Sequence, residues 1–168
     1  RAQALADRAK ARTALGRTRD AADDLERAAE LAASPGEQAE LLAQGGQRLL
    51  EHAQRSGGDA VLALEAAERL ATEATRLDAR CASGWVVLAM VRVGRGDLSS
   101  GAVDAVLRAA AAAPKDARVV ALREALGQQL FVSGVEQRDR GNHRQAVDLF
   151  GTVLRLRPDL VEAYYYRG

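Results

Sequence analysis

Alanine and leucine recur along most of the chain at the three- and four-residue spacing of an amphipathic helix. Short groups of Gly, Pro, Ser, Asn and Asp, which mark turns, separate these segments. The pattern predicts helices over residues 2–15, 19–33, 37–55, 59–77, 81–93, 99–112, 116–140, 143–156 and 160–168. Joints of a few residues make successive helices antiparallel neighbours. The sequence therefore predicts an all-α chain of helical hairpins, forming one continuous domain over residues 1–168.

Glycines interrupt two of the predicted helices. Gly45 and Gly46 lie in the middle of 37–55, where they indicate a kink, a close helix crossing, or a break into two short helices. We expect 116–140 to be one long helix despite Gly127 and Gly134. Capping residues precede three helices: Asp59, Asn142, and either Asp97 or Ser99.

The composition narrows the class of protein. The chain has 168 residues, 4% aromatics, no isoleucine, and 24 basic against 23 acidic residues for a net charge of +1. This argues against disordered, collagen-like, disulfide-rich and all-β chains. The near-zero charge disfavours nucleic-acid binding, and no apolar run is long enough for membrane insertion. An Arg-rich first helix followed by an acidic second helix predicts mutual neutralisation.

Two further features concern the source of the chain. Arginine far outnumbers lysine, which together with the missing isoleucine suggests a GC-rich, bacterial genome. The single cysteine, Cys81, allows no internal disulfide and is compatible with a reducing, cytoplasmic compartment. The chain begins with Arg1 and ends within a helical pattern, so we expect a piece of a longer array.

A pattern of small and large residues recurs along the chain. Its clearest copy is Gly134, Gly141, Ala146, Phe150 and Pro158. Two further copies are Trp85, Leu88, Ala89, Gly96, Ala102, Val106, Ala109 and Pro114, and Leu5, Ala9, Gly16, Ala21, Leu25, Ala28 and Ala33. The pattern resembles the tetratricopeptide repeat, a helical hairpin of about 34 residues. The segment 37–79 matches it poorly.

The resemblance implies a right-handed superhelical solenoid of about four hairpins and a partial fifth. Their approximate ranges are 1–35, 36–79, 80–114, 115–158 and 159–168. The hairpin exits at residues 33, 79, 114 and 158 are 46, 35 and 44 residues apart, so two hairpins are longer than the standard. Stacked hairpins of this kind share a continuous core.

The resemblance also implies a concave surface, lined by the first helix of each hairpin, that receives a peptide or helix of a partner protein. The groove candidates are Lys10, Val86, Met90, Phe131, Val135 and Arg138, with Gln3, Ala6, Thr13, Val93 and Gln128 beside them. The alternative is that the apolar candidates are buried against the extended neighbouring helices. If they line the groove, Phe131→Asp or Met90→Asp abolishes binding without unfolding the chain. A two-carboxylate clamp is not expected, because the asparagine that would accompany Lys10 is missing.

Catalytic and metal-binding spacings such as HExxH, CxxC, GxSxG and the P-loop are missing from the sequence. We therefore expect no catalytic residue, cofactor or metal. His52 and His143 are interpreted as packing or surface residues, and Cys81 as a small buried thiol rather than one with a lowered pKa.

We expect a protein–protein interaction scaffold that is not an enzyme. One alternative is a docking or regulatory module of a larger enzyme. The other is a homo-oligomer, in which Tyr164, Tyr165 and Tyr166 dock into the open end of another copy.

Overall fold

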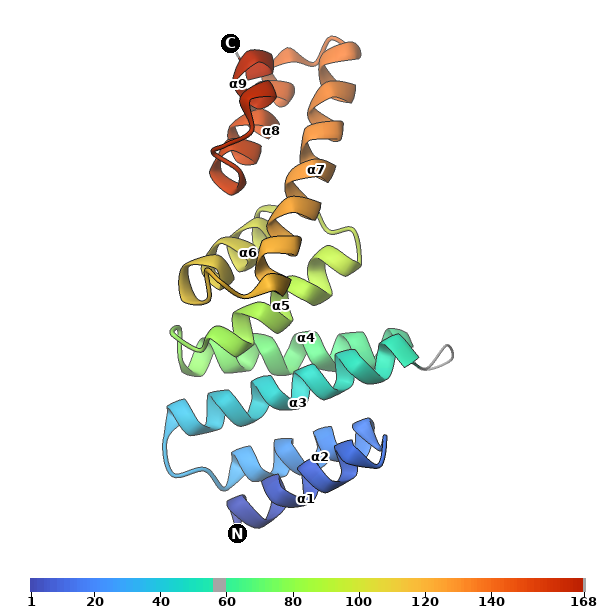
Figure 1. Cartoon of the computed structure of the whole chain (residues 1–168), viewed down its shortest axis with the longest axis vertical. Helices are drawn as coiled ribbons and strands as arrows, with labels where there is room; N and C mark the ends of the chain where they lie inside the picture. Colours follow the sequence, from blue (N-terminus) through green and yellow to red (C-terminus); the bar gives the residue numbers. More distant parts are fainter. Residues whose placement is uncertain (56–59, 168) are drawn as a thin grey trace. The chain divides into compact units, whose positions relative to one another are not determined.

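The computed structural model describes residues 1–55 and 60–167, and these form helices joined by short turns (Figure 1). The helices are α1 (Ala2–Ala14), α2 (Thr18–Glu30), α3 (Pro35–Arg55), α4 (Ala60–Leu77), α5 (Ala82–Gly94), α6 (Ser100–Ala112), α7 (Ala117–Asp139), α8 (His143–Leu156) and α9 (Val161–Arg167). No strand occurs in the described ranges, so the all-α prediction is confirmed.

Three glycines form the turns that follow α1, α5 and α7. Gly16, Gly96 and Gly141 have φ angles of 75°, 71° and 82°, a region that side chains with a Cβ rarely adopt. After α7, the amide of Gly141 donates to the Arg138 carbonyl (2.9 Å) and that of Asn142 donates to the Gln137 carbonyl (2.8 Å). These bonds satisfy carbonyls that the end of the helix leaves free.

Among the predicted N-cap residues that the structure describes, Ser99 makes the expected hydrogen bond and Asn142 does not. The Ser99 hydroxyl accepts a hydrogen bond from the Ala102 amide at the start of α6, as expected for an N-cap. Asn142 occupies the predicted N-cap position of α8, but its side chain makes no capping hydrogen bond and instead donates to Gln137 Oε1 (2.8 Å). Asp116 caps α7 by accepting from the Arg118 amide, which the sequence analysis missed. Asp59 lies outside the described residues.

The chain clusters into two compact units, Arg1–Arg92 and Val93–Gly168, with the boundary inside α5. We refer to them as unit 1 and unit 2. The prediction of one continuous domain with superhelical stacking stays a prediction.

In unit 1, α2 packs between α1 and α3, and α3 packs on α4. Helix α3 is unbroken, so the prediction of two short helices is excluded. A Cβ at Gly45 would lie 3.2 Å from Leu70 Cδ1, and one at Gly46 would lie 3.2 Å from the Ala67 carbonyl oxygen. The glycine pair therefore serves the close crossing of α3 with α4.

In unit 2, α7 packs on α8 and α6, and α8 packs on α9. Helix α7 is one long helix, as predicted. Phe150 of α8 is fully buried and faces Gly134 of α7, where an added Cβ would lie 2.8 Å from Phe150 Cε1. The core of this unit therefore depends on a small residue opposite a large one, as the repeat pattern suggested.

Candidate functional site

Three aromatic rings from three helices meet in unit 2, and we call them the aromatic cluster: Phe131 of α7, Phe150 of α8 and Tyr166 of α9. Their ring centroids are 5.5–5.6 Å apart. The Arg138 guanidinium carbon lies 4.6 Å from the Tyr166 ring centroid. These are favourable distances for aromatic and cation–π contacts. Phe150 is buried, whereas Phe131, Tyr166 and Arg138 are partly exposed.

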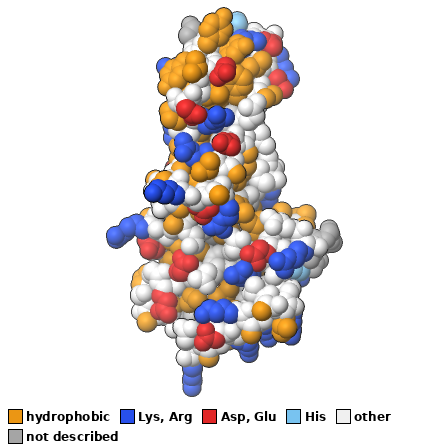
Figure 2. All heavy atoms as spheres, viewed as in Figure 1, with side chains coloured by type: hydrophobic (Ala, Val, Ile, Leu, Met, Phe, Trp, Pro, Cys, Tyr) orange, Lys and Arg blue, Asp and Glu red, His pale blue; other side chains and the backbone are white. Residues whose placement is uncertain are grey.

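Apolar side chains are exposed on the three helices that carry the aromatic cluster. Val132 is 47% exposed, Tyr165 is 81% exposed, and Tyr164 and Val147 are also exposed. Val135, one turn after Phe131 on the same face of α7, is partly exposed. Figure 2 shows hydrophobic side chains gathered at the end of unit 2 that holds α9. Exposed apolar side chains that gather in one region are typical of an interaction site.

The groove candidates of unit 1 are less accessible than the sequence analysis expected. Val86 is only 2% exposed, so its place in an exposed apolar stripe is wrong and the burial alternative holds for it. The reason is that α5 is apolar nearly all round, as is typical of a buried helix. Met90 is partly exposed. Lys10 is exposed, and its Nζ pairs with Asp7 Oδ1 at 3.2 Å.

The three C-terminal tyrosines do not form one free docking group. Tyr166 packs on Phe131 and Phe150 of its own chain, because α9 lies against α8. The Tyr164 hydroxyl donates to the Pro158 carbonyl (3.3 Å). Tyr165 makes an edge contact with Tyr166, with centroids 5.4 Å apart. Tyr166 is therefore also engaged within its own chain, and self-association through Tyr164, Tyr165 and Tyr166 stays a prediction.

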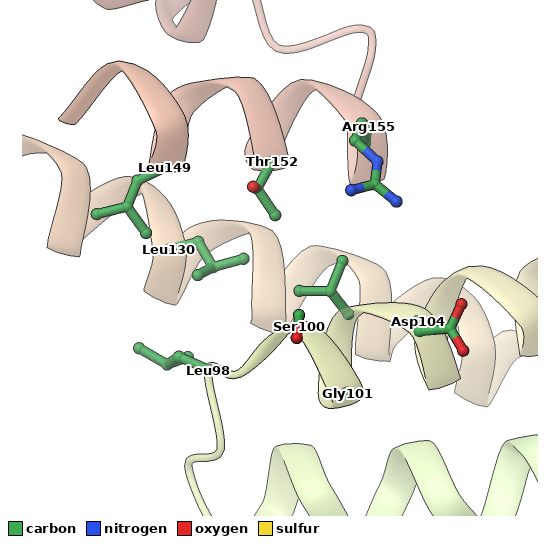
Figure 3. A pocket seen from close by; sticks show the side chains of 9 residues that line it. Leu98, Ser100, Gly101, Asp104, Leu130, Leu149, Thr152 and Arg155 are labelled. Atoms are coloured by element: carbon green, nitrogen blue, oxygen red, sulfur yellow. The ribbon is translucent and has the colours of Figure 1, made fainter. Parts of the chain in front are cut away.

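A second surface feature of unit 2 is a hollow of about 490 Å³ between α6 and α8 (Figure 3), which we call the α6–α8 hollow. It is lined by Leu98, Ser100, Gly101, Val103, Asp104, Leu130, Leu149, Thr152 and Arg155. Leu130 comes from α7, Thr152 and Arg155 project from α8, and Asp104 projects from α6. No short motif marks these residues, because they lie in segments far apart in the sequence.

The two charged residues at the rim of the α6–α8 hollow, Asp104 and Arg155, differ in their ion pairing. Asp104 Oδ2 accepts from Arg108 Nε of its own helix over 2.8 Å. Arg155 is exposed and has no ion pair or hydrogen bond within residues 1–55 and 60–167. The hollow therefore combines apolar walls with one unpaired cation.

Unit 1 contains a comparable hollow between α2 and α4, but it is smaller and an ion pair connects its two sides. Its volume is about 120 Å³, and Leu49 of α3 contributes to its lining, as Leu130 of α7 does in unit 2. Arg69 of α4 pairs with Glu26 of α2 (2.9 Å), and both residues line the hollow. An ion pair thus joins the two walls in unit 1.

A buried carboxylate holds α1 against α2. Asp24 is fully buried, and its two oxygens accept from Arg8 Nε (2.8 Å) and Arg8 Nη2 (2.6 Å). Arg12 Nη1 lies 2.8 Å from Asp24 Oδ2. The hydrogen bonds from Arg8 are the main cause that lowers the pKa of Asp24, although burial opposes them. The predicted neutralisation between the first two helices is confirmed.

The remaining chemical candidates have packing or surface positions. Cys81 is buried, and burial raises the pKa of its thiol, so the alternative of a lowered pKa is wrong. His143 is exposed, and His52 Nδ1 lies 3.3 Å from Thr18 Oγ1. Among the described residues, no three His, Cys, Asp or Glu side chains are placed to hold a metal ion. In the same part of the chain, no helix combines the length and apolarity needed to cross a membrane.

Comparison with known proteins gives a limited result. No family model matches the chain, and no curated protein is significantly similar to it. Among solved structures, a thermophilic TPR protein of Thermus thermophilus is similar with a TM-score of 0.41 and 17% sequence identity, over 99% of this chain and 97% of that one. A likeness of this degree transfers no partner or activity. The helical hairpins with their turn glycines are nevertheless what the resemblance to tetratricopeptide repeats implied.

Proposed function

We propose that the chain is a protein-interaction module that binds a peptide or helix of a partner through the surface around the aromatic cluster. The observation that carries the proposal is the exposed apolar and aromatic area on α7 and α9, next to Arg138. Aromatic residues and arginine are enriched among the side chains that supply most binding energy at interfaces. Phe131, Val135 and Arg138 are groove candidates that the repeat pattern singled out.

Val135 is a better test position than Phe131. The Phe131 ring contacts buried Phe150, so Phe131→Asp would disturb the core as well as the surface. Val135 and Val132 are both at least partly exposed and neither has a ring to remove from the cluster. A charge at these positions opposes burial against an apolar partner while leaving the aromatic contacts in place.

The experiment starts from peptides selected against the wild-type chain from a random display library. Their affinities are then measured by fluorescence anisotropy for Val132→Asp, Val135→Asp and a control, Val120→Asp. Val120 is 40% exposed on the same helix, 11 residues before Phe131 and about 16 Å away along the axis. We expect Val132→Asp and Val135→Asp to weaken binding about tenfold and the control to leave it unchanged.

Equal circular dichroism and equal melting of the three variants confirm that folding is unaffected. Selection of no peptide, or of peptides that bind all variants equally, would contradict the proposed function. Sedimentation of the wild-type chain without peptide tests the alternative: a dimer that Tyr165→Ser dissociates would assign the exposed surface to self-association.

A further inference from the structure

The α6–α8 hollow has the properties of a second docking site, and it uses none of the residues of the aromatic cluster. We propose that it binds an acidic amphipathic segment of a partner protein. In this arrangement the segment places apolar side chains against Leu98 and Leu149, which are partly exposed, and one carboxylate against Arg155. The proposal concerns a different surface from the one in the proposed function and stands independently of it.

The apolar residues of the hollow are the reason for expecting apolar side chains on the partner segment. Leu98 and Val103 line it from the α6 side, Leu149 from α8, and Leu130 from α7. The volume of about 490 Å³ falls within the range of about 300–1,000 Å³ that is usual for ligand sites. Burying apolar side chains here removes apolar surface from water on both partners. The hollow therefore suits side chains such as leucine.

The charge at the rim of the hollow is the reason for expecting an acidic group on the partner segment. Asp104 is already neutralised by Arg108, whereas Arg155 has no partner among the described residues. A guanidinium group pairs with a carboxylate through two parallel hydrogen bonds, which adds orientation as well as attraction. An acidic group is therefore complementary to this rim, and a basic group is not.

The hollow in unit 1 supports this interpretation by contrast. There, the pair between Arg69 and Glu26 joins α4 to α2, and the volume is about 120 Å³. In unit 2, the described residues contain no ion pair from Arg155 to α6, although Asp104 lines the same hollow. The carboxylate that closes the hollow of unit 1 comes from the chain itself, and we infer that a partner supplies it in unit 2.

The test uses the full chain labelled with nitrogen-15 and two synthetic helix-forming peptides of 14 residues. Both peptides carry leucines on one face; the first has glutamates beside them and the second has lysines at the same positions. We expect the acidic peptide to shift the amide signals of Gly101, Val103 and Thr152, and the basic peptide to bind more weakly. Arg155→Ala should weaken binding of the acidic peptide about threefold, as is usual for an exposed ion pair.

Charge reversal gives the most specific readout. Arg155→Glu should make the chain prefer the basic peptide, whereas the control Arg144→Glu should keep the preference of the wild type. Arg144 is an exposed arginine of the same helix, 11 residues earlier, so both variants change the net charge equally. A purely structural role of Arg155 would not exchange the preference.

A third variant tests the apolar half of the hollow. Thr152→Trp fills the space between the walls and should abolish binding of the acidic peptide while the circular dichroism spectrum stays that of the wild type. Three results would overturn the proposal: equal binding of both peptides, equal behaviour of Arg155→Glu and Arg144→Glu, or shifts confined to Phe131 and Val135. The last of these would place the peptide on the aromatic cluster and would leave the proposed function standing.

Discussion

Two glycines of unit 2 occupy opposite environments. At Gly134, an added Cβ would lie 2.8 Å from Phe150 Cε1 and 3.1 Å from Cδ1, and this ring is fully buried. At Gly151 of α8, the added Cβ would have no neighbour within 4 Å apart from the adjoining backbone of its own helix. Gly134 therefore makes room for the core, whereas Gly151 only lowers the stability of its helix.

The same substitution should act in opposite directions at these two sites. We expect Gly134→Ala to lower the free energy of unfolding by about 1–3 kcal/mol, because overpacking forces the Phe150 ring to move. Gly151→Ala should raise it by about 1 kcal/mol, the difference in helix propensity between the two residues. Urea unfolding followed by circular dichroism measures both. Stabilisation by Gly134→Ala would show that the ring relocates without cost.

Asp24 links the charge pattern of the first two helices to the pH dependence of stability. Its pKa is lowered from 3.8 in the folded chain, chiefly by the hydrogen bonds from Arg8. A lowered pKa means that the ionised form is favoured by folding. This stabilisation is fully present above the pKa of the unfolded chain and is lost as the pH falls through the folded value.

Asp24→Asn should therefore destabilise the protein at neutral pH and much less in acid. At pH 7 we expect a loss of about 1.5–3 kcal/mol, the usual contribution of hydrogen bonds to a charged group. Below about pH 4 the difference from the wild type should shrink, because Asp24 of the unfolded chain takes up a proton at a higher pH than Asp24 of the folded chain. Urea unfolding at several pH values tests this. Asp23→Asn, at an exposed neighbour, is the control, and a constant difference across pH would contradict the assignment.

At the scale of whole helices, turn residues and spacing predicted most boundaries closely. The prediction of 143–156 coincides with α8, and 116–140 with α7 to within one residue at each end. The start of α3 was placed two residues late, because Pro35 was interpreted as a turn although proline suits the first helical position. The predicted helix 19–33 runs three residues too far, since Ala32 and Ala33 favour a helix but precede Ser34 and Pro35.

The functional surfaces were less predictable, for a physical reason. Spacing along one helix says which residues share a face, but not which face the next helix covers. Val86 and Phe131 occupy corresponding places in the pattern, yet Val86 is buried and Phe131 is partly exposed. The α6–α8 hollow depends on side chains from residues 98 to 155, so only tertiary packing brings them together.

At the scale of the whole molecule, the boundary between the two compact units falls inside a continuous helix, α5. In arrays of helical hairpins, stability is close to a sum of local and nearest-neighbour contributions. Opening of one part then exposes its own amides without exposing those of distant parts. Gly134 and Gly46 lie in different units. Substitutions at these two positions therefore show whether the chain unfolds in local parts or as one cooperative unit.

Amide hydrogen exchange on the full chain provides the measurement. We expect Gly134→Ala to speed exchange in α7 and α8 by roughly 5- to 150-fold, which corresponds to about 1–3 kcal/mol, with α2 and α3 unchanged. The matched variant Gly46→Ala, whose Cβ would lie 3.2 Å from the Ala67 carbonyl oxygen, should speed exchange in α3 and α4 and spare α8. If either variant speeds exchange equally in all described helices, the chain unfolds as one cooperative unit. If the effect of each variant stays within its own unit, a partner bound to unit 2 can slow amide exchange there without changing amide exchange in α1 and α2.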